Sequence, residues 1–232
     1  MPTTSSPTSS RHSGEVSPKG LIVWLSLSTI LVGLGFLGQA SGDSDPDLFY
    51  DYGLAVSSVV LYGIFIGITV WAATGYGDPI DALGLRSFPF KWMGIAVGLI
   101  FLVLGLAFVL EPILHAGEEQ GYAPDVWRPE RATAFFVNGA VAATFVPFAE
   151  ELFFRGLGVR VLSFLGSAWA ILGTAVVFGL GHGLLVAMPV FIAFGVALGW
   201  VRLRSDSVWP GVVAHGLFNA LALVALYADL QQ

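Results

Sequence analysis

Residues 132–155 read ATAFFVNGAVAATFVPFAEELFFR. Residues 132–149 carry no charged side chain, and about 20 mostly apolar residues suffice for an α-helix to cross a bilayer. Glu150, Glu151 and Arg155 then follow within the same apolar sequence. The stretch therefore predicts a membrane-spanning helix with ionisable groups near one of its ends.

The rest of the chain has the same apolar character. Of its 232 residues, 56% are hydrophobic and only 11% are charged, whereas a typical soluble domain has about 25% charged residues. Apolar runs lie at roughly 20–38, 53–73, 92–110, 132–154, 168–187, 189–201 and 208–228. We therefore expect an all-α, polytopic integral membrane bundle of about seven transmembrane helices. The 168–201 stretch is interpreted as two spans joined by a tight turn, with one tilted helix plus a re-entrant piece as the alternative.

The predicted organisation has three parts. Residues 1–18 are rich in Ser, Thr and Pro and predict a disordered tail. Residues 19–130 contain three N-terminal transmembrane helices and their loops, and residues 131–228 contain the runs with intramembrane ionisable groups. The first run follows basic residues and ends in small ones, which is also the pattern of a signal peptide. Its length favours an uncleaved helix.

The distribution of Lys and Arg predicts the orientation, because cytoplasmic loops are enriched in these residues. With the N-terminus inside, eight lie in inner segments, namely Arg11, Lys19, Arg86, Lys91, Arg155, Arg160, Arg202 and Arg204. Only Arg128 and Arg131 lie in outer loops. The prediction is a multi-pass protein of the cell membrane with a cytoplasmic N-terminus and, with seven spans, an external C-terminus. Its expected partner is the lipid bilayer, and no nucleic acid is expected.

Ionisable groups at membrane depth are costly, by roughly 2.5–3.5 kcal/mol each on insertion scales, so each requires a reason. The chain has no cysteine, which excludes disulfides and thiolate metal sites. Asn138 is predicted to hold two helices together. The intramembrane polar set consists of Glu150, Glu151, Arg155, His182 and His215, with Asn138 and Asn219 as neutral companions.

On a helix, the spacing of Glu150, Glu151 and Arg155 predicts which of these side chains can contact one another. Glu151 and Arg155 stand four residues apart, so they can pair and lower each other's cost. Glu150 points about 100° away around the same helix. The simplest interpretation of the Glu151–Arg155 pair is a structural ion pair, whereas Glu150 remains available for a catalytic role.

Two further spacings place polar groups on shared helix faces. His215 and Asn219 stand four residues apart, as do Phe178 and His182. Taken alone, each of the two histidines is most simply interpreted as a buried residue that forms a hydrogen bond and packs between helices. Taken with Glu150, however, the set predicts a carboxylate, two imidazoles and an amide that face one cavity.

In chain order these residues form three short motifs, Glu150-Glu151-x-x-x-Arg155, Phe178-x-x-x-His182 and His215-x-x-x-Asn219. The set resembles the signature of the CPBP family. That family comprises the type II CAAX prenyl endopeptidases and the bacterial Abi proteins, which include bacteriocin-immunity proteins. The resemblance covers residues from about 130 to 225, so the segment 131–228 is identified as a CPBP intramembrane protease core.

The resemblance implies an intramembrane endopeptidase, a hydrolase that cleaves a membrane-associated peptide near the inner leaflet, with a CAAX-type peptide as one option. Carried over by position, Glu150 with His182 would activate a water for attack on the scissile carbonyl. His215 and Asn219 would stabilise the oxyanion of the tetrahedral intermediate. The supporting residues would be Glu151, Arg155 and Phe178, with Arg155 holding Glu151 and the helix end in place.

Three alternatives accompany this reading. A zinc site would use Glu150, His182 and His215, because two imidazoles, a carboxylate and a water suit zinc; the sequence lacks a local His-Glu-x-x-His pattern, and no cofactor is expected. A non-proteolytic Abi-type membrane immunity or partner protein could use the same fold, but the intact motifs argue against it. A transporter or proton relay also places Glu and His in the membrane, but such proteins often show internal repeats, and none is visible.

Overall fold

The computed structural model describes residues 16–41, 45–119 and 124–231. The structure is 84% helical, and no strand occurs among the residues it describes. The all-α fold class is therefore confirmed. Most of the predicted disordered tail, residues 1–18, lies outside the described residues and stays a prediction.

Six helical segments are long and apolar enough to cross a membrane. Their helices are α1 (Pro18–Ser41), α2 (Tyr52–Ala73), α4 (Lys91–Leu114), α5 (Ala132–Glu151), α8 (Met188–Ser205) and α9 (Trp209–Asp229). A seventh apolar helix, α7 (Ser167–Gly181), is shorter. The protein is thus a multi-pass membrane protein, and the count of seven is approximate.

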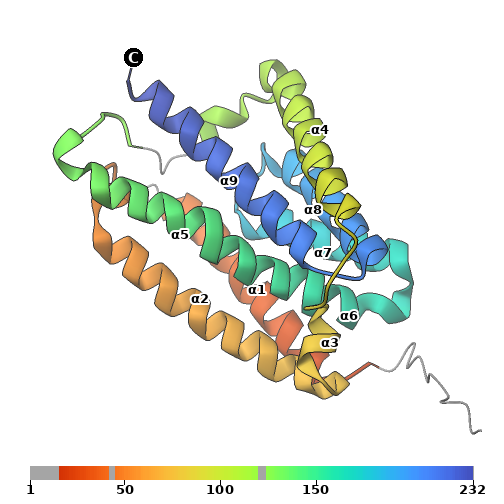
Figure 1. Ribbon diagram of the computed structural model, residues 1–232. Coiled ribbons are helices and arrows are strands. Elements are labelled where there is room, and N and C mark those ends of the chain that lie inside the picture. Colours follow the sequence, from red (N-terminus) through yellow and green to blue (C-terminus); the bar gives the residue numbers. More distant parts are fainter. Residues whose placement is uncertain (1–15, 42–44, 120–123, 232) are drawn as a thin grey trace, which may run out of the picture.

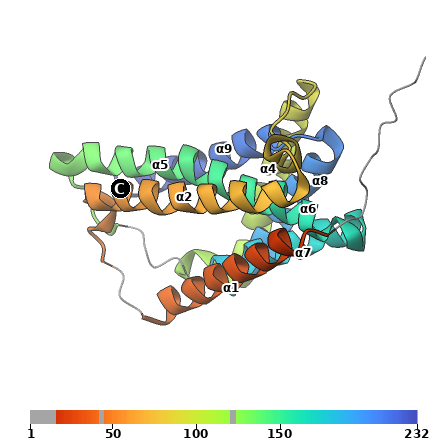
Figure 2. The same cartoon turned by 90° about the horizontal axis from the view of Figure 1, so that it is seen from below.

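The connecting elements are short. They are η1 (Leu48–Tyr50), η2 (Thr74–Tyr76), α3 (Pro79–Leu83), η3 (Ala116–Glu119), η4 (Pro129–Arg131), the π-helical η5 (Leu152–Gly158), α6 (Val159–Leu162) and η6 (Ser163–Leu165). Figures 1 and 2 show α2 and α5 side by side, with α1 and α7 in a second layer below them. α9 packs on α5, and α4 packs on α8 and α9.

One end of the bundle, here called the basic end, carries the start of α1, the end of α2, α3, α6 and the α8–α9 connection. Arg86 Nη1 lies 2.7 Å from Asp206 Oδ2, and the backbone N–H of Val208 donates to the Gly84 carbonyl at 3.0 Å. Lys19 Nζ donates to Thr74 Oγ1. These contacts join segments far apart in sequence into one compact layer.

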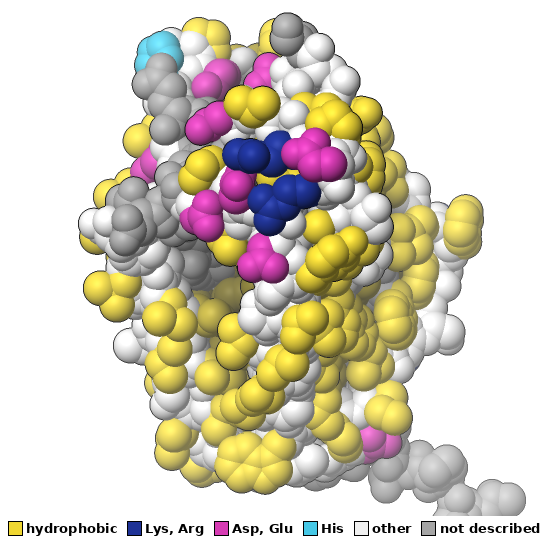
Figure 3. Space-filling model, turned by 90° about the vertical axis from the view of Figure 1, so that its left-hand side faces the viewer, with side chains coloured by type: hydrophobic (Ala, Val, Ile, Leu, Met, Phe, Trp, Pro, Cys, Tyr) yellow, Lys and Arg dark blue, Asp and Glu magenta, His cyan; other side chains and the backbone are white. Residues whose placement is uncertain are grey.

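The opposite end, here called the acidic end, carries the α1–α2 and α4–α5 connections. Arg128 and Arg131 both pair with Asp47, at 2.8 and 3.2 Å. Figure 3 shows these connections from the side, with basic side chains set among acidic ones and mostly hydrophobic side chains over the rest of that face. Asn138 Nδ2 donates to the carbonyls of Phe49 and Asp51, each at 2.9 Å, so it ties α5 to η1 and the start of α2.

The interior is one hydrophobic cluster that runs through both predicted halves of the chain. It contains Trp24 and Ile100 from the first half and Leu152, Phe178 and Val208 from the second. Burying these side chains against one another replaces contacts that lipid tails would otherwise supply, so close packing rather than water exclusion favours the association. The N-terminal helices are therefore part of the same packed body as the C-terminal ones.

The 168–201 stretch folds as two antiparallel helices, α7 and α8, joined by a turn. Gly183 in this turn has a φ of +70°, a conformation that glycine adopts without steric cost. The turn packs on α1 so closely that a Cβ built on Gly35 would lie 2.5 Å from the Gly181 carbonyl oxygen. The interpretation as two spans joined by a tight turn agrees with the structure in the number of helices, but α7 is shorter than the helices that are long enough to cross a membrane.

This close approach predicts a large effect of Gly35→Val. The added side chain must displace α1 from the α7–α8 turn, and overpacking of this kind costs about 1–3 kcal/mol. We expect a lower thermal unfolding midpoint in detergent. Gly33→Val is the matched control, because a Cβ at Gly33 meets no atom within 4 Å. Equal midpoints for the two variants would contradict the packing described.

Candidate active site

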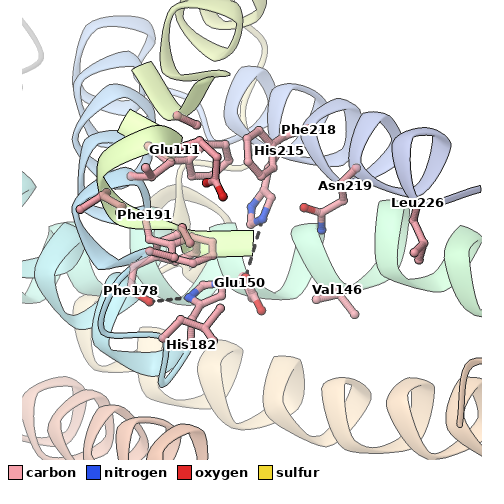
Figure 4. Close-up of a pocket in the computed structure, with 18 of the residues that line it drawn as sticks. Glu111, Val146, Glu150, Phe178, His182, Phe191, His215, Phe218, Asn219 and Leu226 are labelled. Carbon is pink, nitrogen blue, oxygen red and sulfur yellow. Dashed lines mark hydrogen bonds and ion pairs between the residues drawn. The ribbon is translucent and has the colours of Figure 1, made fainter. Parts of the chain in front are cut away.

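Four of the sequence-predicted residues line one cavity of about 630 Å³. Glu150 comes from the end of α5, His182 from the turn after α7, and His215 and Asn219 from α9. Figure 4 shows these side chains converging from separate helices. The walls are largely apolar and include Phe191, so the polar groups are gathered in a cavity with mostly apolar surroundings.

Glu150 is held at one carboxylate oxygen and faces a histidine with the other. The Tyr62 hydroxyl donates to Oε1 at 3.1 Å, and Nε2 of His215 lies 3.8 Å from Oε2. Tyr62 belongs to α2, in the first half of the chain, where the sequence showed only apolar runs. A tyrosine in such a run gives no signal of its own, so its role at the site was not predicted.

The ring of His182 is fixed by the backbone of the helix before it. Its Nδ1 lies 2.8 Å from the Phe178 carbonyl oxygen, and because a carbonyl only accepts, Nδ1 carries the proton. The ring also stacks on Phe191, with centroids 4.1 Å apart. In the neutral ring Nε2 is therefore the basic nitrogen, and His182 lines the cavity beside Glu150.

His215 is fixed by the second carboxylate of the first motif. Its Nδ1 donates to Glu151 Oε1 at 3.1 Å, which turns Nε2 toward Glu150 and the cavity. The same Glu151 oxygen lies 2.9 Å from Arg155 Nη1, and the two side chains are 0% and 1% exposed. Glu151 thus forms the predicted pair with Arg155 and in addition orients a histidine, a contact that sequence spacing did not reveal.

The charged pair is enclosed by aromatic and aliphatic groups. The Arg155 guanidinium lies over the Phe178 ring, 4.5 Å from its centroid, a cation–π arrangement that favours a buried cation. The motif continues into the π-helical η5, Leu152–Gly158, in which every residue is buried. π-helical turns inside α-helices are frequent at functional sites.

Asn219 is positioned against α5. Its Nδ2 donates to the Ala142 carbonyl at 2.8 Å, and one further amide hydrogen and Oδ1 remain for a bound molecule. The two helices meet closely because Gly216 has no side chain there; a Cβ at Gly216 would lie 2.5 Å from the Ala143 carbonyl oxygen. Pro147, which has no N–H, leaves that carbonyl without its usual helical donor.

Glu111 is a second carboxylate that the sequence did not place at the site. It lies on α4 one residue beyond the predicted apolar run 92–110, and it lines the same cavity. Figure 4 shows its carboxylate directed into the cavity from the side opposite Glu150. A run boundary one residue later would have counted it among the intramembrane groups.

A second, smaller cavity of about 160 Å³ lies on the other side of Glu150 and His182. α1 and α2 contribute Leu31, Tyr62 and Phe65 to its wall. A water occupies about 30 Å³ of liquid volume, so this space is large enough for several. Glu150 and His182 therefore line both cavities.

The zinc alternative requires Glu150, His182 and His215 to converge on one ion. Within the described part of the chain, no group of three or more His, Asp or Glu side chains is arranged to hold a metal. The residues as placed do not fit a zinc site, and the expectation of a metal-free reaction stays a prediction.

The fold and cavity define a helical membrane protein with a Glu–His–His–Asn site between its helices. Residues 132–221 match the family model described as type II CAAX prenyl endopeptidase Rce1-like. No curated protein and no solved structure matches the chain. The matched segment contains all three motifs, so the resemblance inferred from the motifs is confirmed over this part of the chain.

The hydrogen bond from Tyr62 predicts a kinetic effect of Tyr62→Phe. A hydrogen bond to a charged group is worth about 1.5–3 kcal/mol, so peptide cleavage should slow roughly 10- to 100-fold in kcat with little change in KM. Tyr52→Phe is the control, because Tyr52 is on the same helix but 52% exposed. Wild-type kcat in Tyr62→Phe would show that the bond does not position Glu150.

Proposed function

We propose that this protein is an intramembrane endopeptidase in which Glu150 and His182 activate a water and His215 and Asn219 stabilise the oxyanion. The observation that carries the proposal is the convergence of these four side chains, from three segments of the chain, on one apolar-walled cavity. Groups that cost free energy in a bilayer are retained where they serve a function.

In the first step, the Glu150 carboxylate takes a proton from a water that also lies near His182 Nε2. The hydroxide attacks the scissile carbonyl and forms a tetrahedral intermediate. The proton held by Glu150 then passes to the departing amine as the C–N bond breaks. General acid–base catalysis of this kind contributes about 10²–10⁴-fold.

The negative charge of the intermediate requires donors, and the geometry of α9 supplies two. Asn219 offers its remaining amide hydrogen. His215 directs its Nδ1–H at Glu151, so its Nε2 donates to the oxyanion only when that nitrogen carries a proton as well. Donors aimed at a developing oxyanion in a dry site are worth several kcal/mol.

The substrate class follows from the surroundings of the site. The cavity lies within an apolar bundle, so a peptide that is itself membrane-associated reaches it most readily. The family description names CAAX prenyl endopeptidases, and a CAAX-type peptide is one candidate for this chain. The cell membrane, with the N-terminus cytoplasmic, is the proposed location.

The test is loss of cleavage on changing Glu150. We expect Glu150→Gln to lower the release of peptide products from detergent-solubilised or membrane-embedded protein by roughly 10²–10⁴-fold, as measured by mass spectrometry of the products. Glu130→Gln, an exposed change in η4, is the matched control. Unchanged products in Glu150→Gln, with the fold intact, would refute the proposal.

A second prediction separates catalysis without a metal from catalysis with one. Asn219→Ala should lower kcat by roughly 10²–10³-fold while KM changes little, and dialysis against a chelator should leave activity largely intact. Asn138→Ala is the matched control, because Asn138 also donates to backbone carbonyls but lies away from the cavity; it should lower stability and spare kcat. One equivalent of tightly bound zinc per chain, required for turnover, would overturn the metal-free reaction.

A further inference from the structure

The smaller cavity, of about 160 Å³, meets the candidate active site from the side of α1 and α2. Among the described residues, the walls of the two cavities share Glu150, Phe178 and His182. Tyr62 lines the smaller cavity, whereas His215 and Asn219 line the larger one. In Figure 4, Glu150 and His182 lie between α9, which carries His215, and the faint orange ribbon of α2. The three shared side chains therefore form a partition between two spaces.

The two carboxylate oxygens of Glu150 face different sides of this partition. Oε1 accepts the hydrogen bond of the Tyr62 hydroxyl at 3.1 Å, whereas Oε2 lies 3.8 Å from Nε2 of His215. Tyr62 belongs to the wall of the smaller cavity and His215 to that of the larger one. Glu150 is therefore placed to take a proton from a water on the Tyr62 side while a peptide occupies the His215 side.

The smaller cavity lies beside α1, between two levels at which this helix is in close contact with its neighbours. Trp24, Leu31 and Gly35 follow one another on one face of α1. A Cβ on Gly158 would lie 2.5 Å from Trp24 Nε1, and a Cβ on Gly35 would lie 2.5 Å from the Gly181 carbonyl oxygen. Leu31 lies between these levels and lines the cavity. Because both close contacts hold α1 in place, a shift of this helix does not close the space.

The polar groups of this wall suit water. The Tyr62 hydroxyl gives its proton to Glu150, and its oxygen still has lone pairs that accept. His182 directs Nδ1–H at the Phe178 carbonyl, so its Nε2 remains an acceptor. Gly181 lines the wall at the end of α7, where helix carbonyls lack intrahelical donors. A buried water makes about three hydrogen bonds and takes up about 30 Å³, so these acceptors can hold a short chain of waters.

Resting on the proposed function, we infer that the smaller cavity is a water chamber, which binds the water consumed in hydrolysis while the peptide occupies the larger cavity. The larger cavity has mostly apolar walls, so a bound peptide displaces water from it. The chamber lies on the other side of the Glu150–His182 partition and keeps its water when the peptide is bound.

The chamber supplies one water for each bond cleaved. The water gives one proton to Glu150, and its oxygen forms a bond to the scissile carbon. The proton then leaves on the amine as the C–N bond breaks, so the products are a carboxylic acid and an amine. The chamber refills across the Glu150–His182 partition once the products have left the larger cavity.

Filling the chamber tests this inference. Leu31→Phe places a larger side chain in the chamber and should lower kcat roughly 10- to 100-fold with little change in KM, because the peptide side of the partition is unchanged. Leu34→Phe is the matched control, since Leu34 lies on the same helix but is 61% exposed; it should keep the wild-type kcat.

Two kinetic results would overturn the inference. One is a wild-type kcat in Leu31→Phe together with an unchanged thermal unfolding midpoint, which would show that turnover does not need the chamber. The other is a higher KM at unchanged kcat, which would assign the filled space to the peptide site instead.

A second measurement needs no turnover. The chain contains no cysteine, so Leu31→Cys introduces a single thiol with its own S–H stretching band in the infrared spectrum, and a cysteine is too small to overpack the site. On transfer of the detergent-solubilised protein to D₂O, this band should be replaced by an S–D band much faster than that of Leu34→Cys, which faces detergent or acyl chains.

Equally slow exchange of the two thiols would show that the chamber is dry and would overturn the inference. Because the exchange records water and not cleavage, its outcome is separate from that of the Glu150→Gln experiment. Fast exchange at Leu31→Cys together with unchanged cleavage by Glu150→Gln would leave the water site in place and refute the proposed function.

Discussion

The buried pair of Glu151 and Arg155 constrains the rest of the structure. Moving two charges into an apolar interior costs several kcal/mol per ion, which their attraction offsets only when geometry and surrounding contacts are good. Glu151 meets this demand with two partners, since the same oxygen faces Arg155 and His215. Phe178 covers the guanidinium. The end of α5, the end of α7 and the first half of α9 are therefore drawn to one point, and the three motifs meet there.

In this arrangement the two adjacent glutamates have different roles: Glu151 has a structural role, and Glu150 has the proposed catalytic one. Glu151 is enclosed and neutralised, whereas Glu150, about 100° further around the helix, faces the cavity. Tyr62 then completes the site from α2. Because one carboxylate orients His215 and the other stands 3.8 Å from its Nε2, the helix that carries the proposed base also positions one of the proposed oxyanion donors.

The short α7–α8 hairpin determines the shape of the space around these groups. A longer α7 would carry its turn to the membrane surface and fill the region that the cavity occupies. The short helix instead leaves His182 in the wall of the cavity, and Glu119 accepts hydrogen bonds from the turn that follows it.

The sequence by itself determined the helical membrane class, the approximate spans and the four polar residues of the cavity. Each of these depends on composition or on a spacing within one helix, such as His215 with Asn219, which helical geometry converts directly into a shared face. Only the tertiary structure decided the contact of Tyr62 with Glu150, the place of Glu111 in the cavity wall and the contact of Glu151 with His215. These features depend on how neighbouring helices are rotated and shifted against one another. In a bundle whose helices are apolar on nearly all faces, the local sequence does not encode that rotation, because lipid and protein neighbours are equally apolar and close packing alone selects it.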